Sequence, residues 1–256
     1  MNIYVIMKRT FDTEERIAIE NGNIKSDGVE FIINPYDEYA IEEGIALKEK
    51  HGGEVTVVTF GEEEADKELR TALAMGADKA VLIDSEDFEE IDQYTTASIL
   101  ATYLKDENPD IILAGNVAVD GGSGQVGPRV AELLGIPQVT AITSLTIEDG
   151  KATLIHDVEG DEETLEVPLP VLVTTQQGLN EPRYPSLPGI MKAKKKPLTI
   201  LELDDLDVEE EDVEAKTEKV EVFLTPKKQQ GKVLAGELNQ QVQELVSLLK
   251  SEAKVI

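Results

Sequence analysis

The sequence has no cysteine, very few histidines and no long hydrophobic run, and each absence narrows the possible functions. Without cysteine, the chain can form neither disulfides nor thiolate metal sites. Its two histidines, His51 and His156, are far apart in the sequence. We expect both at the surface, because a metal site needs several convergent ligands. No apolar run approaches the roughly 18 residues of a membrane-spanning helix, so we expect none.

The N-terminal segment lacks the pattern of a signal peptide. Its apolar stretch, within residues 1–12, is short and is soon followed by charged side chains. That pattern is more typical of a first β-strand. We therefore expect a cytoplasmic protein.

Basic residues are scarce, since 24 Lys and Arg face 52 Asp and Glu and the formal net charge is −28. An acidic surface repels phosphate, which argues against nucleic acid as a partner and against attraction to anionic membranes. A basic cluster is unusual in such a chain. One is present, at Lys192, Lys194, Lys195 and Lys196.

Strand-like and helix-like segments alternate over the first 142 residues. Apolar runs typical of buried strands occupy 2–8, 54–60, 79–83, 110–115 and 137–142. Asn34, followed by Pro35 and Asp37, is typical of a helix start. The expected helices cover 35–51, 62–75, 93–106 and 125–134. This order predicts an α/β fold with a doubly wound, mainly parallel, Rossmann-like sheet. Asn21-Gly22 predicts a hairpin turn.

The pattern changes after residue 143. Alternating residues up to 175 predict antiparallel additions to the sheet, and 176–196 has no apolar period and predicts a long loop. The acid-rich stretch 202–214 predicts an extended, solvated connector. A last strand is possible at 220–224, and an amphipathic helix is expected at 237–250. We therefore expect an α/β domain over 1–197 and a C-terminal arm over 198–256.

A glycine-rich segment, Gly122 to Gly127, matches G-x-G-x-x-G. A dinucleotide site needs this loop directly after an early strand and an acid at a later strand end. Here the loop follows the fourth strand after a gap, and the candidate acids Glu148 and Asp149 lie in a hairpin turn. We therefore reject NAD binding by this motif. Two interpretations remain open: an anion site at the carboxyl end of a parallel strand, or a flexible β–α connection.

Other strand ends should meet this loop at one sheet edge. Lys8 is the only cation among these ends, and Asn34 begins a helix nearby. A lysine, helix N–H groups and glycine backbone together form a reasonable site for a nucleotide phosphate. No P-loop, Ser/His/Asp set, HExxH or G-x-S-x-G motif occurs. The sequence therefore favours a nucleotide site without catalytic residues.

The segment 178–196 is a second candidate surface. It holds three prolines, the four lysines, and apolar side chains at Tyr184, Leu187, Ile190 and Met191. A long loop with apolar residues suggests a partner surface. The alternative is a helix whose lysines complement its own C-terminus.

The stretch LNEPRYPSLPGIMKAKKKP (179–197) closely resembles the signature of the electron-transferring flavoprotein β-subunit family. VIMKR (5–9), RTALAMGADKA (70–80) and AVDGGSGQVGP (118–128) agree with it in order, and the resemblance spans nearly the whole chain. It implies an adenine-nucleotide-binding type of domain in an electron carrier, not an enzyme. In this family a larger α subunit holds most of the FAD. Electrons pass from acyl-CoA and related dehydrogenases of fatty acid β-oxidation to a membrane quinone reductase.

The resemblance also implies structural AMP in the β subunit. Its contacts would fall at Ile6, Asn34, Pro35, Tyr36, Asp37, Phe60, Gly115, Asn116, Asp120, Gly121, Gly122, Ser123, Gly124, Gln125 and Val126. Where some relatives have polar side chains, this chain has glycines, so the implied contacts there are made by backbone. The resemblance further implies that Leu187 anchors the docking loop in dehydrogenases and that the C-terminal arm wraps the α subunit.

Three different functions stay open beside this one. In the first, the chain holds a second FAD in place of AMP, because the glycines also resemble electron-bifurcating relatives that bind FAD there. Those relatives read Asp-Gly-Asp, whereas this chain reads Asp120-Gly121-Gly122, so we favour AMP. The second is an adenylating enzyme that uses an adenine nucleotide, and the third is a stand-alone nucleotide sensor.

Overall fold

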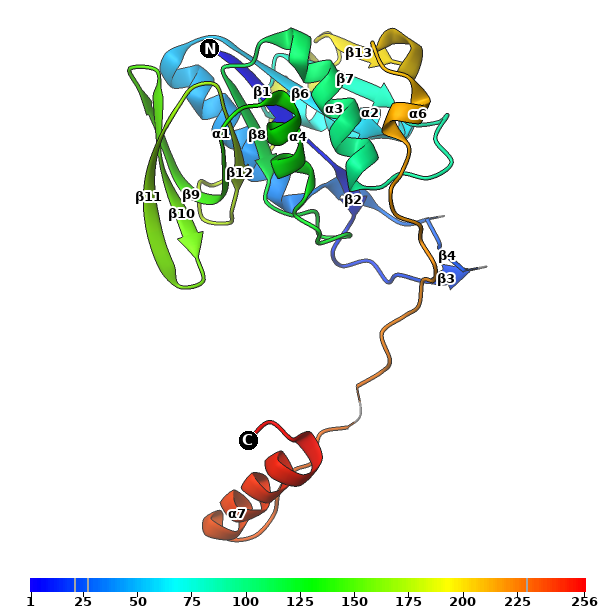
Figure 1. Ribbon diagram of the computed structural model, residues 1–256, viewed down its shortest axis with the longest axis vertical. Coiled ribbons are helices and arrows are strands. Elements are labelled where there is room, and N and C mark those ends of the chain that lie inside the picture. Colours follow the sequence, from blue (N-terminus) through cyan, green and yellow to red (C-terminus); the bar gives the residue numbers. More distant parts are fainter. Residues whose placement is uncertain (21, 27, 229) are drawn as a thin grey trace.

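The computed structural model describes residues 1–256 except Asn21, Asp27 and Gln229. Within the described residues its centre is a nine-stranded sheet of order β11-β10-β9-β12-β8-β1-β6-β7-β13 (Figure 1). In chain order, these strands are β1 (Asn2–Ile6), β6 (Glu54–Gly61), β7 (Lys79–Asp84), β8 (Ile111–Gly115), β9 (Gln138–Glu148), β10 (Lys151–Val158), β11 (Asp161–Pro168), β12 (Val171–Thr175) and β13 (Leu198–Leu201).

The helices occupy most of the predicted places. They are α1 (Pro35–His51), α2 (Asp66–Met75) after a 3₁₀ turn η1 (Glu63–Ala65), α3 (Gln93–Glu107), α4 (Val126–Leu134), α5 (Leu187–Ala193), α6 (Glu210–Val213) and α7 (Leu238–Leu248). A second 3₁₀ turn, η2 (Leu203–Asp205), precedes α6, and a π-helical turn, η3 (Leu249–Ala253), continues α7.

The central strands run parallel, as the alternation of strands and helices predicts. β1 pairs with β6 and β8, and β7 pairs with β6 and β13, all in parallel register. The antiparallel part is β9-β10-β11 at one side of the sheet. The doubly wound, mainly parallel fold is therefore confirmed.

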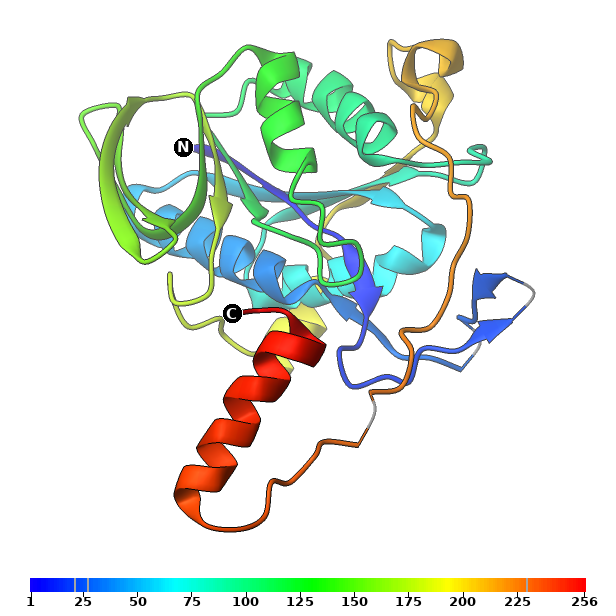
Figure 2. The same ribbon diagram turned by 60° about the horizontal axis from the view of Figure 1, so that its bottom comes forward.

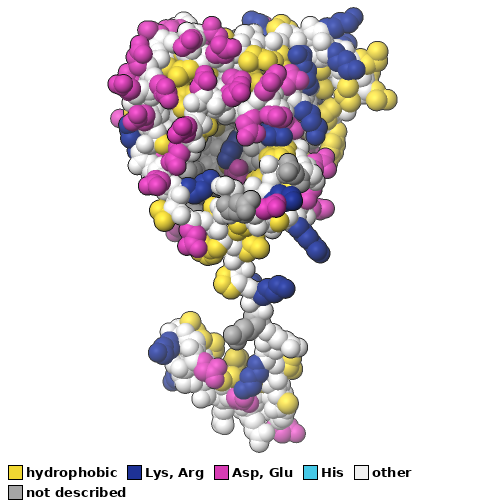
Figure 3. All heavy atoms as spheres, turned by 90° about the vertical axis from the view of Figure 1, so that its right-hand side faces the viewer, with side chains coloured by type: hydrophobic (Ala, Val, Ile, Leu, Met, Phe, Trp, Pro, Cys, Tyr) yellow, Lys and Arg dark blue, Asp and Glu magenta, His cyan; other side chains and the backbone are white. Residues whose placement is uncertain are grey.

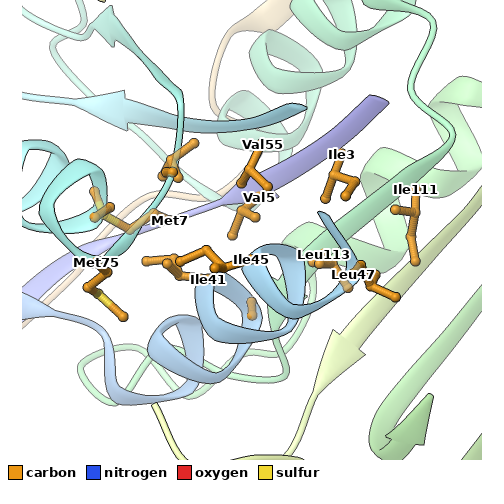
Figure 4. Close-up of a cluster of buried hydrophobic side chains, with 14 of the residues drawn as sticks. Ile3, Val5, Met7, Ile41, Ile45, Leu47, Val55, Met75, Ile111 and Leu113 are labelled. Carbon is orange, nitrogen blue, oxygen red and sulfur yellow. The ribbon is translucent and has the colours of Figure 1, made fainter. Parts of the chain in front are cut away.

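Helices cover both faces of the sheet, as Figure 2 shows. Alternation along β1 sends Ile3 and Val5 to the face that α1, α2 and α5 cover, where they meet Ile41 and Leu113 (Figure 4). Tyr4 and Ile6 point to the opposite face, which α3 and α4 cover. Because both faces are buried, the parallel strands are apolar almost throughout.

Two short pairs lie outside the main sheet. β2 (Arg9–Phe11) pairs antiparallel with β5 (Phe31–Ile33), and β3 (Ile19–Glu20) pairs antiparallel with β4 (Asn23–Ile24). The second pair flanks the predicted hairpin turn. Asn21, half of that turn, lies outside the described residues.

The expectation of antiparallel additions up to residue 175 is wrong for the last strand. β12 lies between β8 and β9 and runs parallel to both. β9 is also longer than expected, because its first half belongs to the parallel sheet and its second half starts the hairpin with β10. β12 is fully buried, so its place is in the core.

Three expectations for the C-terminal third need correction. The loop 176–196 contains helix α5. The acid-rich stretch 202–214 is not simply extended, since it forms η2 and α6 and buries Val213 in the core cluster beside α3. The proposed strand at 220–224 does not form. The sheet also extends into the predicted arm, because β13 begins at Leu198, directly after the expected boundary.

The last part of the chain leaves the α/β body. We call residues 218–256 the distal arm. Figure 1 shows it running as an extended chain to α7, which stands apart from the sheet. No residue of α7 is buried. The amphipathic helix predicted at 237–250 is therefore present, with its apolar stripe exposed.

Candidate functional site

A cavity of about 420 Å³ opens at the carboxyl edge of the parallel strands. The ends of β1, β6 and β8, the first turns of α3 and α4, and the glycine-rich loop surround it. Figure 3 faces this side and shows a hollow with Lys or Arg side chains at its rim, below a surface dense in Asp and Glu. The cavity lies where open α/β sheets bind their ligands.

Most of the predicted nucleotide residues line this cavity. They are Ile6, Lys8, Phe60, Gly115, Asn116, Gly121, Ser123, Gly124, Gln125 and Val126. The remaining six are not part of the lining: Asn34, Pro35, Tyr36, Asp37, Asp120 and Gly122. Asn34 and Asp37 are buried behind it, and hold the lining in place.

Asp37 ties together the ends of two strands. Its carboxylate accepts hydrogen bonds from the backbone N–H of Lys8 (2.6 Å) and of Gly115 (2.9 Å), and from the side-chain amide of Asn34 (3.0 Å). Burial raises the pKa of Asp37 to about 7, while these three hydrogen bonds act in the opposite direction. Since each of these three neighbours donates, the geometry fits the ionised carboxylate.

Asn34 does not cap α1 with its side chain, contrary to the expectation. Its amide nitrogen instead donates to the carbonyl oxygen of Val117 (2.9 Å), and its amide oxygen accepts from the N–H of Val119 (3.1 Å). The side chain therefore fixes the chain just before the glycine-rich loop. α1 begins without a side-chain cap because Asn34 is committed to this loop.

Glycine is required at two positions in the backbone around the cavity. A Cβ at Gly115 would clash with the Asp37 carboxylate and lie 2.8 Å from Tyr36 Cβ. A Cβ at Gly127, in the first turn of α4, would lie 2.8 Å from Thr174 Cγ2. The backbone at both places therefore packs too closely for any side chain.

The start of α4 offers backbone donors to the cavity. Gln125 is its N-cap residue but makes no side-chain cap; its side-chain oxygen accepts from Arg129 instead (2.9 Å). The first N–H groups of a helix lack intrahelical partners, and the dipole favours an anion there. Because Gln125 and Val126 line the cavity, this helix start can receive a phosphate.

Lys8, the predicted cation of the site, is paired within the chain. Its ammonium lies 2.7 Å from the Asp120 carboxylate, with the lysine side chain about half exposed. An anionic ligand at this place would compete with Asp120 for Lys8. Arg9, which the sequence analysis missed, also lines the cavity, and its guanidinium stacks over the Phe31 ring at 3.7 Å.

The opposite side of the cavity was also missed. Thr59 at the end of β6, Ser85 after β7, and Asp92, Gln93 and Thr96 at the start of α3 line it. The rule that parallel strands end at one sheet edge could have found Thr59 and Ser85, since both fall at predicted strand ends. Nothing in the local sequence distinguishes the residues of α3 from an ordinary helix start.

The docking segment, residues 178–196, is held to the body but leaves four large apolar side chains outside. Arg183 forms a double ion pair with Glu42 (2.9 Å) and Glu49 (2.7 Å) of α1. α5 packs on α2, yet its predicted docking residues remain exposed, as does the tyrosine that precedes the helix: Tyr184 (95%), Leu187 (80%), Ile190 (44%) and Met191 (73%).

The basic cluster divides into two parts. Lys196 donates to the carbonyl oxygens of Leu73 (2.9 Å) and Ala77, so it caps the end of α2. Lys192 lies in the last turn of α5, as the alternative helix interpretation expected. Lys194 and Lys195 are exposed beside the apolar side chains.

The fold and the cavity define an α/β protein with a cavity at the edge of its sheet, where the start of α4 could receive an anion. Comparison with known proteins makes this class specific. The profile described as "Electron transfer flavoprotein domain" matches residues 22–206. The electron transfer flavoprotein subunit beta of Bacillus subtilis is 66% identical over the full length of both chains.

More distant relatives carry the same name. The subunit beta of Syntrophomonas wolfei is 43% identical over 100% of this chain and 98% of its own, and the mitochondrial subunit beta of Oryza sativa subsp. japonica is 37% identical over both full lengths. The chain therefore belongs to the electron transfer flavoprotein β-subunit family, whose members are subunits of an electron carrier and not enzymes. The family prediction is confirmed. Among the described residues, no helix is long and apolar enough to cross a membrane.

Proposed function

We propose that this chain pairs with a larger α subunit, binds AMP in its own cavity, and forms with its partner a carrier whose FAD lies mostly in the α subunit. The carrier takes electrons from acyl-CoA and related dehydrogenases in fatty acid β-oxidation. It passes them to a membrane quinone reductase. Because a relative with 66% identity is bacterial, we propose the cytoplasm as its location.

The observation that carries the AMP proposal is the backbone cradle between β1, β8 and α4. A phosphate needs N–H donors and a positive charge. The start of α4, which has no side-chain cap, offers the donors, and Lys8 offers the charge. The close packing at Gly115 and Gly127 fixes the backbone around them. The cavity volume of about 420 Å³ lies at the low end of the range for small-molecule sites. A mononucleotide fits that volume better than a dinucleotide does.

The partner proposals are supported by exposed apolar surface. The distal arm carries apolar side chains that are exposed to solvent, among them Val220, Phe223 and Val233. An α subunit that covers them would remove this surface from water. The docking segment provides a second such surface at a different place, which fits a dehydrogenase.

Nucleotide released on unfolding tests the cavity. We expect the purified heterodimer to release AMP in about one equivalent per chain of this subunit, measured by mass spectrometry after denaturation. Bound AMP should also raise thermal stability, by about 2.7 kcal/mol at a hundredfold excess over its dissociation constant. Two equivalents of FAD and no AMP would move the function to an electron-bifurcating complex. Absence of any adenine nucleotide would refute the site.

A further inference from the structure

Asp92, at the mouth of the cavity, divides its two carboxylate oxygens between two parts of the molecule. Oδ1 caps α3, accepting from the N–H groups of Tyr94 (2.8 Å) and Thr95 (2.9 Å). Oδ2 accepts from the N–H groups of Lys216 (2.9 Å) and Thr217 (3.0 Å) and from the Thr217 hydroxyl (3.0 Å). One side chain thus joins a helix of the cavity to the point where the distal arm departs.

Its environment holds Asp92 ionised. Partial burial by itself raises its pKa, but the hydrogen bonds from Thr95, Lys216, Thr217 and Tyr94 outweigh burial and lower the pKa to about 2. The bonds to Lys216 and Thr217 are therefore charge-assisted at neutral pH, and such bonds are stronger than neutral ones.

The segment before the arm is attached to the same helix. Tyr94 donates its hydroxyl hydrogen to the carbonyl oxygen of Asp212 (3.1 Å), and Lys216 lies over the Tyr94 ring at 5.0 Å. Val213 is buried against α3. Over the described part of the distal arm, no hydrogen bond or ion pair reaches the rest of the chain. Lys216 and Thr217 are thus the last attachment of the arm.

The same turn of α3 faces the cavity. Asp92, Gln93 and Thr96 all line it, and their positions depend on the cap that Asp92 forms. A partner that holds the distal arm also restricts Lys216 and Thr217, and through Asp92 the first turn of α3. When the ligand then binds, the first turn of α3 is already ordered, so this part of the entropic cost of binding is not incurred again.

We propose that Asp92 is a positioning residue through which nucleotide binding in the cavity and binding of the distal arm to the α subunit strengthen each other. The inference rests on the proposed function, which supplies AMP and the α subunit as the two ligands. Coupling between two binding sites is reciprocal. AMP must therefore tighten the heterodimer by the same factor by which the α subunit tightens AMP.

The test is the dissociation constant of the full chain with its α subunit, measured with and without saturating AMP. We expect AMP to tighten the native pair by about fivefold or more. In Asp92→Ser the ratio should fall to near one. Serine caps a helix about as well as aspartate, so α3 keeps its start, but its single hydroxyl oxygen cannot also hold Lys216 and Thr217. Circular dichroism and the melting temperature check that the variant folds.

Two further variants separate the arm contact from loss of charge. Asp87→Ser removes another exposed acid from the loop before α3. The Asp87 side chain forms no hydrogen bond or ion pair with a described residue, so this variant should keep the full ratio. Thr217→Val removes one of the three donors to Oδ2 and should give an intermediate ratio.

The outcomes distinguish this inference from the proposed function. If AMP binds normally but the dissociation constant of the heterodimer is the same with and without AMP, the coupling is overturned and the AMP site stands. An undiminished ratio in Asp92→Ser also overturns it. If neither the free chain nor the heterodimer binds AMP, the proposed function fails and the coupling fails with it.

Discussion

Leu187→Ala perturbs the docking segment where the apolar surface is most exposed. The Leu187 side chain begins α5 and is 80% exposed, so the free chain gains little from it. We expect the free energy of unfolding to change by less than about 0.5 kcal/mol. Complete burial of a leucine side chain stabilises by about 1.5–3 kcal/mol. The exposed four-fifths of the leucine therefore leave about 1.2–2.4 kcal/mol for burial by a partner, which corresponds to roughly seven- to fiftyfold in affinity.

The assay is electron transfer from an acyl-CoA dehydrogenase to the heterodimer, with the heterodimer concentration varied. The apparent KM for Leu187→Ala should rise by about sevenfold or more, while FAD content, AMP content and melting temperature stay near those of the native protein. Leu133→Ala is the matched control, since Leu133 is an exposed leucine on α4, away from α5. It should leave the apparent KM unchanged.

Two results would refute this reasoning. If Leu187→Ala lowers the melting temperature together with activity, the side chain stabilises the fold rather than a complex. If the apparent KM is unchanged, the dehydrogenase does not contact α5 through Leu187. High salt should also raise the apparent KM of the native protein if Lys194 and Lys195 face an acidic partner, because screening weakens such attraction.

The remaining predictions concern the supports of these surfaces. In Gly189→Ala, the added Cβ would clash with a carbonyl oxygen of α2, so α5 should shift and the apparent KM should rise although Leu187 is intact. In Asp37→Asn, the amide must point its NH₂ at a backbone donor; unfolding should become easier by about 1–3 kcal/mol in denaturant titrations, and bound AMP should fall. A chain ending at Thr217 should bind the α subunit weakly yet keep its melting temperature. A chain ending at Leu203 should also melt earlier, because it loses the buried Val213.

The sequence predicts most of the parallel sheet because, after the hairpin region that follows the first strand, apolar runs and helical periods alternate regularly. β12 shows where the prediction fails. It follows directly on a hairpin, so proximity in the chain suggested another antiparallel strand. Its composition held a better signal, since VLVTT does not alternate and is buried on both faces, whereas the neighbouring β11 alternates and is largely exposed.

Helix α5 was expected only as the alternative to a loop, and the burial of Val213 was not expected, for different physical reasons. Pro188 suggested a loop, yet proline is tolerated in the first turn of a helix, and Ser186 supplies the cap with its hydroxyl (3.1 Å to the N–H of Gly189). Val213 is one apolar residue among acids, and only the tertiary structure shows that it reaches the core beside α3. Long-range packing of a single side chain leaves no periodic signal in a sequence.

The site residues were found to the extent that strand ends and glycines mark them. Their roles differ from the expectation, because Asn34 and Asp37 do not line the cavity but hold the backbone that does. This difference matters for Gly121, Gly122 and Gly124, which offer the site no polar side chains. When the cradle is fixed from behind by buried side chains, its N–H groups stay aimed at the cavity whatever occupies the loop.

Ligand choice must then be made by the few side chains that do reach the cavity. Near the glycine-rich loop these include Lys8, with its counter-ion Asp120, and Gln125, which is engaged by Arg129. Asn116, Ser123 and Arg9 also line this side. The far side offers the hydroxyls of Thr59, Ser85 and Thr96. If AMP binds as proposed, the N–H groups at the start of α4 would hold its phosphate, and any nucleotide phosphate could accept hydrogen bonds from them. We therefore predict that discrimination between AMP and a larger adenine nucleotide comes from the far side, where Asp92 also holds Lys216 and Thr217.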